Sequence, residues 1–401
     1  MGEPIHDKPI EAPPPRTALL LAGGGARAAY HVGVLKAIAE ILPDEAPNPF
    51  PVLSGASAGA LNAAALAIYA RNFRQATRLL ERVWSNFTVD QVFRSDFVGM
   101  FETWARWWWA LFFGGATRRN PVAILNRAPL RELLNRYMLC DRIQSAIDAG
   151  LVHALAVAAS GYTSGQSVTF FQGPPTLGSW KRANRVGCAC AITVDHLMAS
   201  SAIPFVFEAV KLQREYFGDG SMRQIAPLSA PIRLGAERIL VIGVRQEYAV
   251  REARKENAPY PSLAQIGGHV LSSIFLDSLE ADVERLRRIN DAIRFIPSHH
   301  LVSHATGEFL RPVDALMISP SEDLSAIADR HKHHFPPAVR FMLRGLGAYR
   351  QGTGDLISYL LFEKPYTREL IALGYNDAMR RRVEIERFFR EPIAVARTAP
   401  V

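Results

Sequence analysis

Two short apolar runs, each followed by a glycine-rich turn and a helical pattern, constrain the fold more than any other feature. The first run is TALLLA at 17–22, followed by three glycines and by apolar residues at helical spacing over 26–41. The second is PVL at 51–53, followed by GASAG and an alanine-rich helical stretch over 58–70. Buried strands that alternate with helices form layered α/β sheets, so this region predicts an α/β fold.

The rest of the chain continues this alternation to about residue 250 and then becomes mainly helical. Helical spacing predicts a long amphipathic helix past residue 260 and mostly helix to about residue 390. The further predicted strands are 153–159, 168–171, 238–244 and 315–318, and the further predicted helices before residue 150 are 71–83 and 121–137.

These patterns divide the chain into three parts. Residues 1–15 are polar and proline-rich without an apolar signal-peptide core, so we expect a flexible tail and no secretory signal. Residues 16–250 carry the α/β pattern and predict one folded domain, in which the candidate catalytic motifs below lie, and 251–401 predict a mostly helical extension packed on it. No apolar run reaches the roughly 20 residues of a transmembrane helix.

The net charge and the small number of cysteines limit the kinds of ligand that we expect this chain to bind. The chain has 46 Lys+Arg against 38 Asp+Glu, a formal net charge of +8. This balance suits an anionic membrane surface, but without a long basic run it also fits an ordinary solvated surface, and we expect no nucleic-acid partner. Cys140, Cys188 and Cys190 are too few for a disulfide framework. A lone C-x-C is weak evidence of a metal site, so we expect no metal and no cofactor.

The glycine loop Gly23-Gly24-Gly25-Ala26-Arg27 follows a predicted strand and opens a helix. Glycines permit positive φ and let backbone N–H groups face an anion. The loop therefore has two interpretations, a nucleotide-phosphate loop and an oxyanion hole. A dinucleotide site needs an acidic residue at the end of the next strand, where this chain has Ser-Gly-Ala-Ser. That difference favours the oxyanion hole.

The G-x-S-x-G at 55–59 places Ser57 between a predicted strand and a predicted helix. This is the context in which the pattern marks a nucleophile elbow, with Gly55 and Gly59 leaving room for a tight turn. A serine hydroxyl is a poor nucleophile until a base takes its proton. The sequence therefore predicts a nucleophilic Ser57 and requires a base elsewhere in the chain.

Two kinds of base are available. An α/β-hydrolase uses a histidine, but it places its serine after several strands, and Ser57 follows only two. The histidines after Ser57 lie mostly in polar stretches: His153, His196, His269, His299, His300, His304, His331, His333 and His334. The other candidate is Asp219, in a loop with Gly220 and Ser221, which needs partial desolvation to act as a base at neutral pH. Alone, such a G-D-G is also typical of an Asx turn.

Four stretches together resemble the patatin-like phospholipase family: GGGARAAYHVGVL, GASAGALNA, ASSAIPFVF and GDGSMRQIAPL, which span about residues 16–250. The resemblance implies a three-layer α/β/α sandwich and a Ser–Asp dyad without histidine. It assigns Ser57 as nucleophile, Asp219 as base, and the loop from Gly23 to Arg27 as the oxyanion hole. Two positions depart from the family pattern, Ala28 after the loop arginine and Ser221 after the dyad glycine, and Ser221 adds a hydroxyl near the base.

The stretch FETWARWWWALFF predicts contact with lipid. Tryptophan favours the membrane–water interface, and this stretch holds Trp104, Trp107, Trp108 and Trp109. It is equally typical of a lid, of a buried helix over the active site or of a self-association face. We expect a cytoplasmic protein that contacts the inner face of a membrane.

The sequence thus predicts a serine acyl hydrolase of the phospholipase A or lysophospholipase type. The resemblance favours phospholipid or lysophospholipid as substrate. Two alternatives stay open. One is an acyltransferase or thioesterase that uses the same Ser57 acyl-enzyme, and the other is a non-catalytic lipid-binding protein.

Overall fold

The computed structural model describes residues 16–94, 123–246, 260–296, 310–349 and 354–390. Within these residues ten strands form one mixed sheet in the order β10-β9-β1-β2-β3-β4-β6-β5, with β8 paired to β3 and to β7. The strands are β1 (Thr17–Leu21), β2 (Val52–Ala56), β3 (Ala154–Gly161), β4 (Ser167–Gln172), β5 (Trp180–Arg182), β6 (Arg185–Ala189), β7 (Val210–Leu212), β8 (Glu215–Asp219), β9 (Arg238–Ile242) and β10 (Asp314–Ile318).

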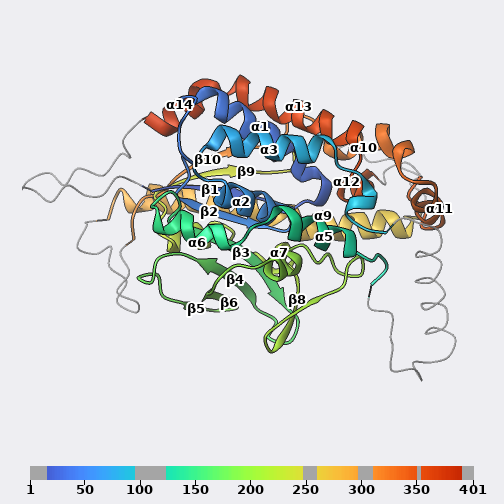
Figure 1. The fold of residues 1–401 in the computed structure, drawn as a ribbon, viewed down its shortest axis with the longest axis horizontal. Coiled ribbons are helices and arrows are strands. Elements are labelled where there is room, and N and C mark those ends of the chain that lie inside the picture. The colour runs from blue at the N-terminus through green and yellow to red at the C-terminus, as the bar shows by residue number, and fades with distance from the viewer. Residues whose placement is uncertain (1–15, 95–122, 247–259, 297–309, 350–353, 391–401) are drawn as a thin grey trace, which may run out of the picture.

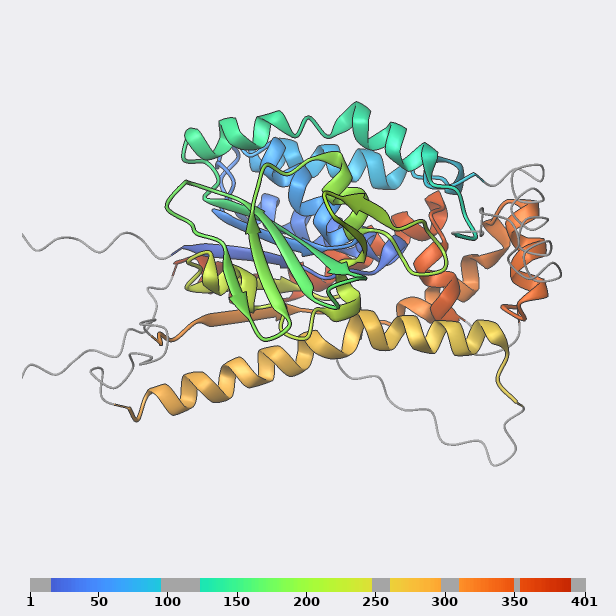
Figure 2. The same ribbon diagram turned by 90° about the horizontal axis from the view of Figure 1, so that it is seen from below.

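Helices cover both faces of the sheet, so the predicted three-layer α/β/α sandwich is confirmed (Figures 1 and 2). Those of the first 250 residues are α1 (Ala29–Ile41), α2 (Ala58–Ile68), α3 (Phe73–Ser85), α5 (Ala128–Tyr137), α6 (Asp141–Asp148), α7 (Val194–Ser200) and α8 (Ser229–Arg233). Those after residue 250 are α9 (Leu263–Ile293), α10 (Leu324–His331), α11 (Pro337–Gly345), α12 (Gly354–Leu360), α13 (Lys364–Arg380) and α14 (Arg382–Arg390).

The alternation of side chains along β1 shows why both faces are covered. Leu19 and Leu21 join the core beneath α1, α2, α3 and α13, whereas Ala18 and Leu20 join a second core beneath α8 and α9. Successive strand residues point to opposite faces, and an apolar residue at every position requires cover on both. The unbroken TALLL run of β1 therefore dictates a central strand of a sandwich.

The C-terminal segment is built into this sandwich. As predicted, the segment around residues 315–318 is a strand: β10 pairs in parallel with β9 at the sheet edge. Helix α13 lies along α1 (Figure 1), and Gly33 of α1 approaches it so closely that an added Cβ would sit 2.0 Å from the Ile371 carbonyl oxygen. The chain after residue 250 thus adds a strand to the sheet and covers both of its faces, with α13 on one face and α9 on the other.

One predicted helix is shorter than expected. The spacing over 121–137 predicted a continuous helix, but α5 begins at Ala128. The prediction is wrong for the described residues before it, because the Ile124 and Leu125 N–H groups donate to the Phe205 and Val206 carbonyls at 3.0 and 2.9 Å. These long-range bonds hold the segment extended.

The described part of the chain has neither a membrane-spanning helix nor a metal cluster. No helix in it combines the length and the apolar character that crossing a bilayer requires. No group of three or more His, Cys, Asp or Glu side chains gathers there as metal ligands would. Its three cysteines are free thiols.

Candidate active site

Ser57 occupies a strained turn between β2 and α2. Its φ of 52° and ψ of −132° lie outside the regions that non-glycine residues prefer, a conformation that costs about 1–3 kcal/mol and is typical of functional sites. Both glycines of the elbow are required by close approach. A Cβ on Gly55 would lie 2.6 Å from the Gly59 carbonyl carbon, and one on Gly59 would lie 2.4 Å from the Leu21 carbonyl oxygen.

The backbone of Ser57 is held by a residue that sequence reasoning missed. Its N–H donates to Ser200 Oγ at 2.9 Å, and Ser200 is fully buried at the end of α7. Ser200 lies in the ASSAIPFVF stretch, which we matched to the family without assigning it a role. The match of that stretch to the family is the sequence signal that could have pointed to this contact.

Asp219 ends strand β8 and is fully buried. Antiparallel pairing of β8 with β3 places it opposite Ala159, and its N–H donates to the Ala202 carbonyl at 2.9 Å. Its Oδ1 accepts a 2.9 Å hydrogen bond from the Ser221 N–H. Gly220 is required here, because a Cβ would meet the Ala158 carbonyl oxygen at 2.1 Å. The sheet thus presents Asp219 on a rigid, closely packed corner.

The structure brings Asp219 and Ser57 together. Burial raises the pKa of the Asp219 carboxyl to about 6, although a hydrogen bond from the Ser57 side chain, further hydrogen bonds from Ser221 and the charge of Arg127 all lower it. Among the described residues, Asp219 Oδ2 has no hydrogen-bond partner with full geometry. The Ser57 hydroxyl is thus close enough to lower the pKa of the carboxyl, while Oδ2 is left open to accept a proton.

Arg127 is a second residue that sequence reasoning missed. It is 5% exposed, and its Nη1 donates to the Met198 carbonyl at 2.6 Å while its Nη2 donates to the Glu208 carbonyl at 2.5 Å. Burial lowers the pKa of the Arg127 guanidinium to about 10. Nothing in its local sequence distinguishes it from the other arginines, because its partners lie more than 70 residues away.

The glycine loop leaves β1 beside the elbow. Leu21 of β1 pairs with Gly55 of β2, so both turns leave the same edge of adjacent parallel strands. Gly25 has a φ of 55° and opens the 3₁₀ helix η1 (Gly25–Ala28). Within the described chain, no backbone carbonyl accepts from the N–H groups of Gly24, Gly25 or Ala26, which leaves them available to an oxyanion.

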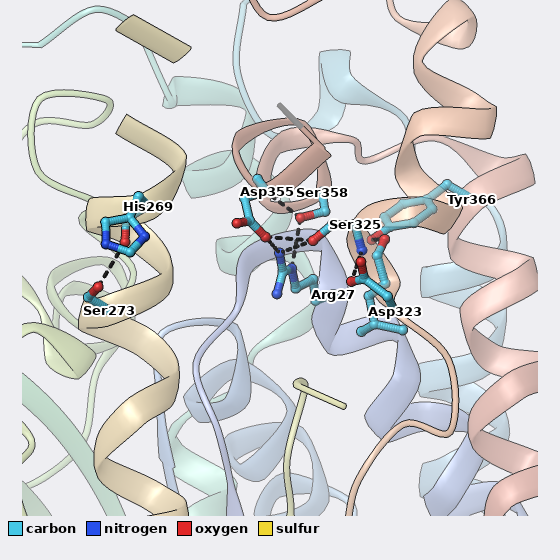
Figure 3. A network of polar contacts seen from close by, with 9 residues as sticks. Arg27, His269, Ser273, Asp323, Ser325, Asp355, Ser358 and Tyr366 are labelled. Carbon is cyan, nitrogen blue, oxygen red and sulfur yellow. Dashed lines mark hydrogen bonds and ion pairs between the residues drawn. The ribbon is translucent and has the colours of Figure 1, made fainter. Parts of the chain in front are cut away.

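Arg27, predicted as part of the oxyanion hole, lies differently. Its backbone N–H donates to the Gly24 carbonyl at 3.1 Å, which closes the turn. Its side chain is 3% exposed and reaches polar residues of α10 and α12 (Figure 3). Arg27 thus shapes the loop, and the donors we expect are the N–H groups before it.

The described histidines have other roles. His31 is fully buried, and burial lowers its pKa to about 3. His153 contacts Arg16, His196 contacts Thr193 and Cys190, and His331 contacts Glu369. The candidates His299, His300 and His304 lie outside the described residues. No histidine of the described ranges hydrogen-bonds to Ser57 or to Asp219.

A family model described as patatin-like phospholipase matches residues 19–232, which is more than half of the chain and includes the glycine loop, Ser57 and Asp219. The chain belongs to the patatin-like phospholipase family. The general activity of this family is lipid acyl hydrolysis. The resemblance drawn from the four sequence motifs is therefore confirmed.

Comparisons with individual proteins give only distant matches. No curated protein matches this chain. VipD from Legionella pneumophila aligns over 93% of this chain and 67% of its own, with 13% identity and a TM-score of 0.38. A chain of the heterodimeric ExoU-SpcU complex of Pseudomonas aeruginosa aligns over 97% of this chain and 81% of its own, with 16% identity and a TM-score of 0.28.

The tryptophan-rich stretch with Trp104, Trp107, Trp108 and Trp109 lies outside the described residues. The described residues that flank it are joined, since the Arg94 N–H donates to the Asn126 carbonyl at 2.9 Å. Residues 94 and 126 are therefore side by side. Ile124 and Leu125, next to Asn126, bond in turn to Phe205 and Val206 of the ASSAIPFVF stretch.

Proposed function

We propose that the chain is a serine acyl hydrolase that cleaves carboxylic esters of membrane lipids, in the manner of a phospholipase A or lysophospholipase. The observation that carries this proposal is the pairing of Ser57, on its strained elbow, with the fully buried Asp219. Family membership supplies the substrate class. The buried pair of Ser57 and Asp219 provides the nucleophile and the base that acyl transfer requires.

In the first half-reaction Asp219 takes the proton of the Ser57 hydroxyl as Oγ attacks the ester carbonyl carbon. The tetrahedral intermediate places its oxyanion against the N–H groups of Gly24, Gly25 and Ala26. Each such donor typically contributes about 10²–10³ in rate. The C–O bond then breaks, the protonated Asp219 gives its proton to the departing alcohol, and an acyl-enzyme remains on Ser57.

In the second half-reaction Asp219 acts again as general base. It takes a proton from water, which attacks the acyl carbonyl, and returns that proton to Ser57 Oγ as the fatty acid leaves. A pKa of about 6 suits both roles, because the carboxyl is ionised at neutral pH yet a far better base than a solvated aspartate. Desolvation at the end of β8 is what supplies this pKa.

We also propose a cytoplasmic location and contact with the inner face of a membrane through Trp104, Trp107, Trp108 and Trp109. The described residues on either side of this stretch support the proposal, because Arg94 bonds to Asn126 and the neighbouring Ile124 and Leu125 bond to the segment that follows α7. Phe205 in that loop is 79% exposed and adds apolar surface there. Replacing Trp107, Trp108 and Trp109 by alanine should weaken binding to anionic liposomes, and unchanged partitioning would contradict it.

A lipidomic substrate screen tests the proposed activity. Purified protein is incubated with mixed phospholipids and lysophospholipids, with Ser57→Ala as control, and released fatty acids are identified. The proposal expects Ser57-dependent release, and labelling of Ser57 by a fluorophosphonate. Acyl transfer to added alcohols or thiols would show a transferase or thioesterase instead. Absence of both labelling and product would indicate a lipid-binding protein.

A further inference from the structure

The side chain of Arg27 joins the glycine loop to the C-terminal segment through three hydrogen bonds (Figure 3) and a cation–π contact. Nε donates to Ser358 Oγ at 2.8 Å, and Nη2 donates to Ser325 Oγ and to Asp355 Oδ1, both at 2.9 Å. The guanidinium also lies over the ring of Tyr359, with its carbon 4.3 Å from the ring centroid. We call Ser325, Asp355 and Ser358 the arginine clamp.

The clamp residues hold one another as well as Arg27. Ser325 Oγ donates to Asp355 Oδ1 at 2.6 Å, and Ser358 Oγ donates to the Asp355 carbonyl at 2.6 Å. A cavity of about 280 Å³ lies beside the guanidinium, bordered by Arg27, Ser325 and Asp355. Arg27 is nonetheless only 2% exposed, so its guanidinium is buried at the edge of this cavity and held there by its hydrogen bonds and its ion pair with Asp355.

Fixing the side chain of Arg27 also fixes the loop backbone. The same residue closes the turn through its N–H to the Gly24 carbonyl. On the far side, Gly25 lies against α12, where an added Cβ would be 2.3 Å from the Tyr359 carbonyl oxygen. The proposed oxyanion donors Gly24, Gly25 and Ala26 are thus enclosed by contacts that begin in α10 and α12.

We propose that the arginine clamp positions the oxyanion donors through Arg27, so that Ser325, Asp355 and Ser358 assist catalysis without touching the substrate. This inference rests on the proposed function. Transition-state stabilisation depends on donor geometry, and a misplacement of about 1 Å costs up to about 10²-fold in rate. Ser325, Asp355 and Ser358 are therefore positioning residues for the acyl-transfer steps.

Asp355→Asn is the test variant. The side chain of Asp355 is 42% exposed, so its amide form is tolerated, but it loses the charge that holds Nη2. The matched control is Glu237→Gln. Glu237 is 33% exposed and pairs with Arg311 at 3.2 Å, which also joins the first 250 residues to the C-terminal segment. That pair lies at the start of β9 and β10, the opposite end of the strands from the glycine loop.

The readout is the kcat and KM for a phospholipid ester, together with the rate and final extent of fluorophosphonate labelling at Ser57. We expect Asp355→Asn to lower kcat and the labelling rate by about 10–100-fold with KM and final extent unchanged. Ser325→Ala should act in the same direction, and Glu237→Gln should leave all four values at wild type.

Three outcomes would overturn the inference. Unchanged kcat in both clamp variants would show that the loop keeps its geometry without the clamp. A reduced final extent with a normal labelling rate would show that Asp355 serves folding alone. An equal loss of kcat in Glu237→Gln would show a general effect of linking the two segments. Failure of the proposed function is separate: the wild-type protein would then show no Ser57-dependent hydrolysis or labelling.

Discussion

The glycine loop lies between two buried polar centres that differ in how well their atoms are satisfied. On one side, Asp219 Oδ2 and Ser221 Oγ have no hydrogen-bond partner with full geometry among the described residues. On the other side, Arg27 is bonded to Ser325, Asp355 and Ser358. The first centre keeps donors and acceptors ready for a substrate, and the second uses all its contacts to hold the loop. The side of the glycine loop next to Asp219 is therefore suited to reaction, and the side next to Arg27 is held rigidly.

The largest expected effect on kcat comes from substitutions of Ser57 and Asp219. Ser57→Ala removes the nucleophile and should lower kcat by about 10⁶, and Asp219→Asn removes the base and should lower it by about 10²–10⁴. Hydrolysis of a phospholipid followed by fatty-acid release measures both. Substantial activity in Asp219→Asn would show that Asp219 is not the base that activates Ser57. The histidines would then again be candidates for that role.

Arg27→Gln tests the satisfied centre and should damage both activity and stability. It removes a buried guanidinium from three hydrogen bonds, and loss of one partner from a buried ion pair costs about 3–5 kcal/mol, less here because Asp355 is partly solvated. We expect about a 10²-fold lower kcat and a lower midpoint in urea unfolding. A variant with normal kcat and normal unfolding would show that the clamp is dispensable.

Asp219→Asn should have the opposite effect on stability. The folded pKa of Asp219 is raised from 3.8 to about 6, so the ionised carboxylate destabilises the native state above pH 6 and this cost disappears below pH 3.8. The asparagine variant should therefore be more stable than wild type by about 3 kcal/mol at pH 8. Urea unfolding at pH 8 and at pH 4 measures it, and the gain should nearly vanish at pH 4.

The smallest effect concerns Ser221, where the chain departs from the family pattern. Its N–H donates to Asp219 Oδ1 at 2.9 Å, and both this N–H and the nearby hydroxyl of Ser221 lower the pKa of Asp219. Ser221→Ala removes the hydroxyl alone, so the pKa should rise by less than about one unit and the acid limb of the pH–rate profile should move to higher pH. An acid limb that stays in place or moves to lower pH would contradict the proposed effect of the Ser221 hydroxyl on Asp219.

The two centres also differ in how far they could be predicted from the sequence. The elbow around Ser57 and the glycine loop could be predicted from the sequence. Each consists of a strand, a tight turn and a helix that neighbouring residues determine. The partner Asp219 required the family resemblance, since only the pairing of β8 with β3 brings it to Ser57. The side-chain partners of Arg27 lie 298 to 331 residues away along the chain, and no local pattern indicates them.

The pH dependence of kcat/KM for a phospholipid ester tests the central claim most directly, because it reports the ionisation of the base in the free enzyme. The account predicts that activity rises with pH through an apparent pKa of about 6 and that this limb is absent from the residual activity of Asp219→Asn. A limb that persists in Asp219→Asn would show that another group takes the proton of Ser57 and would contradict the Ser57–Asp219 dyad.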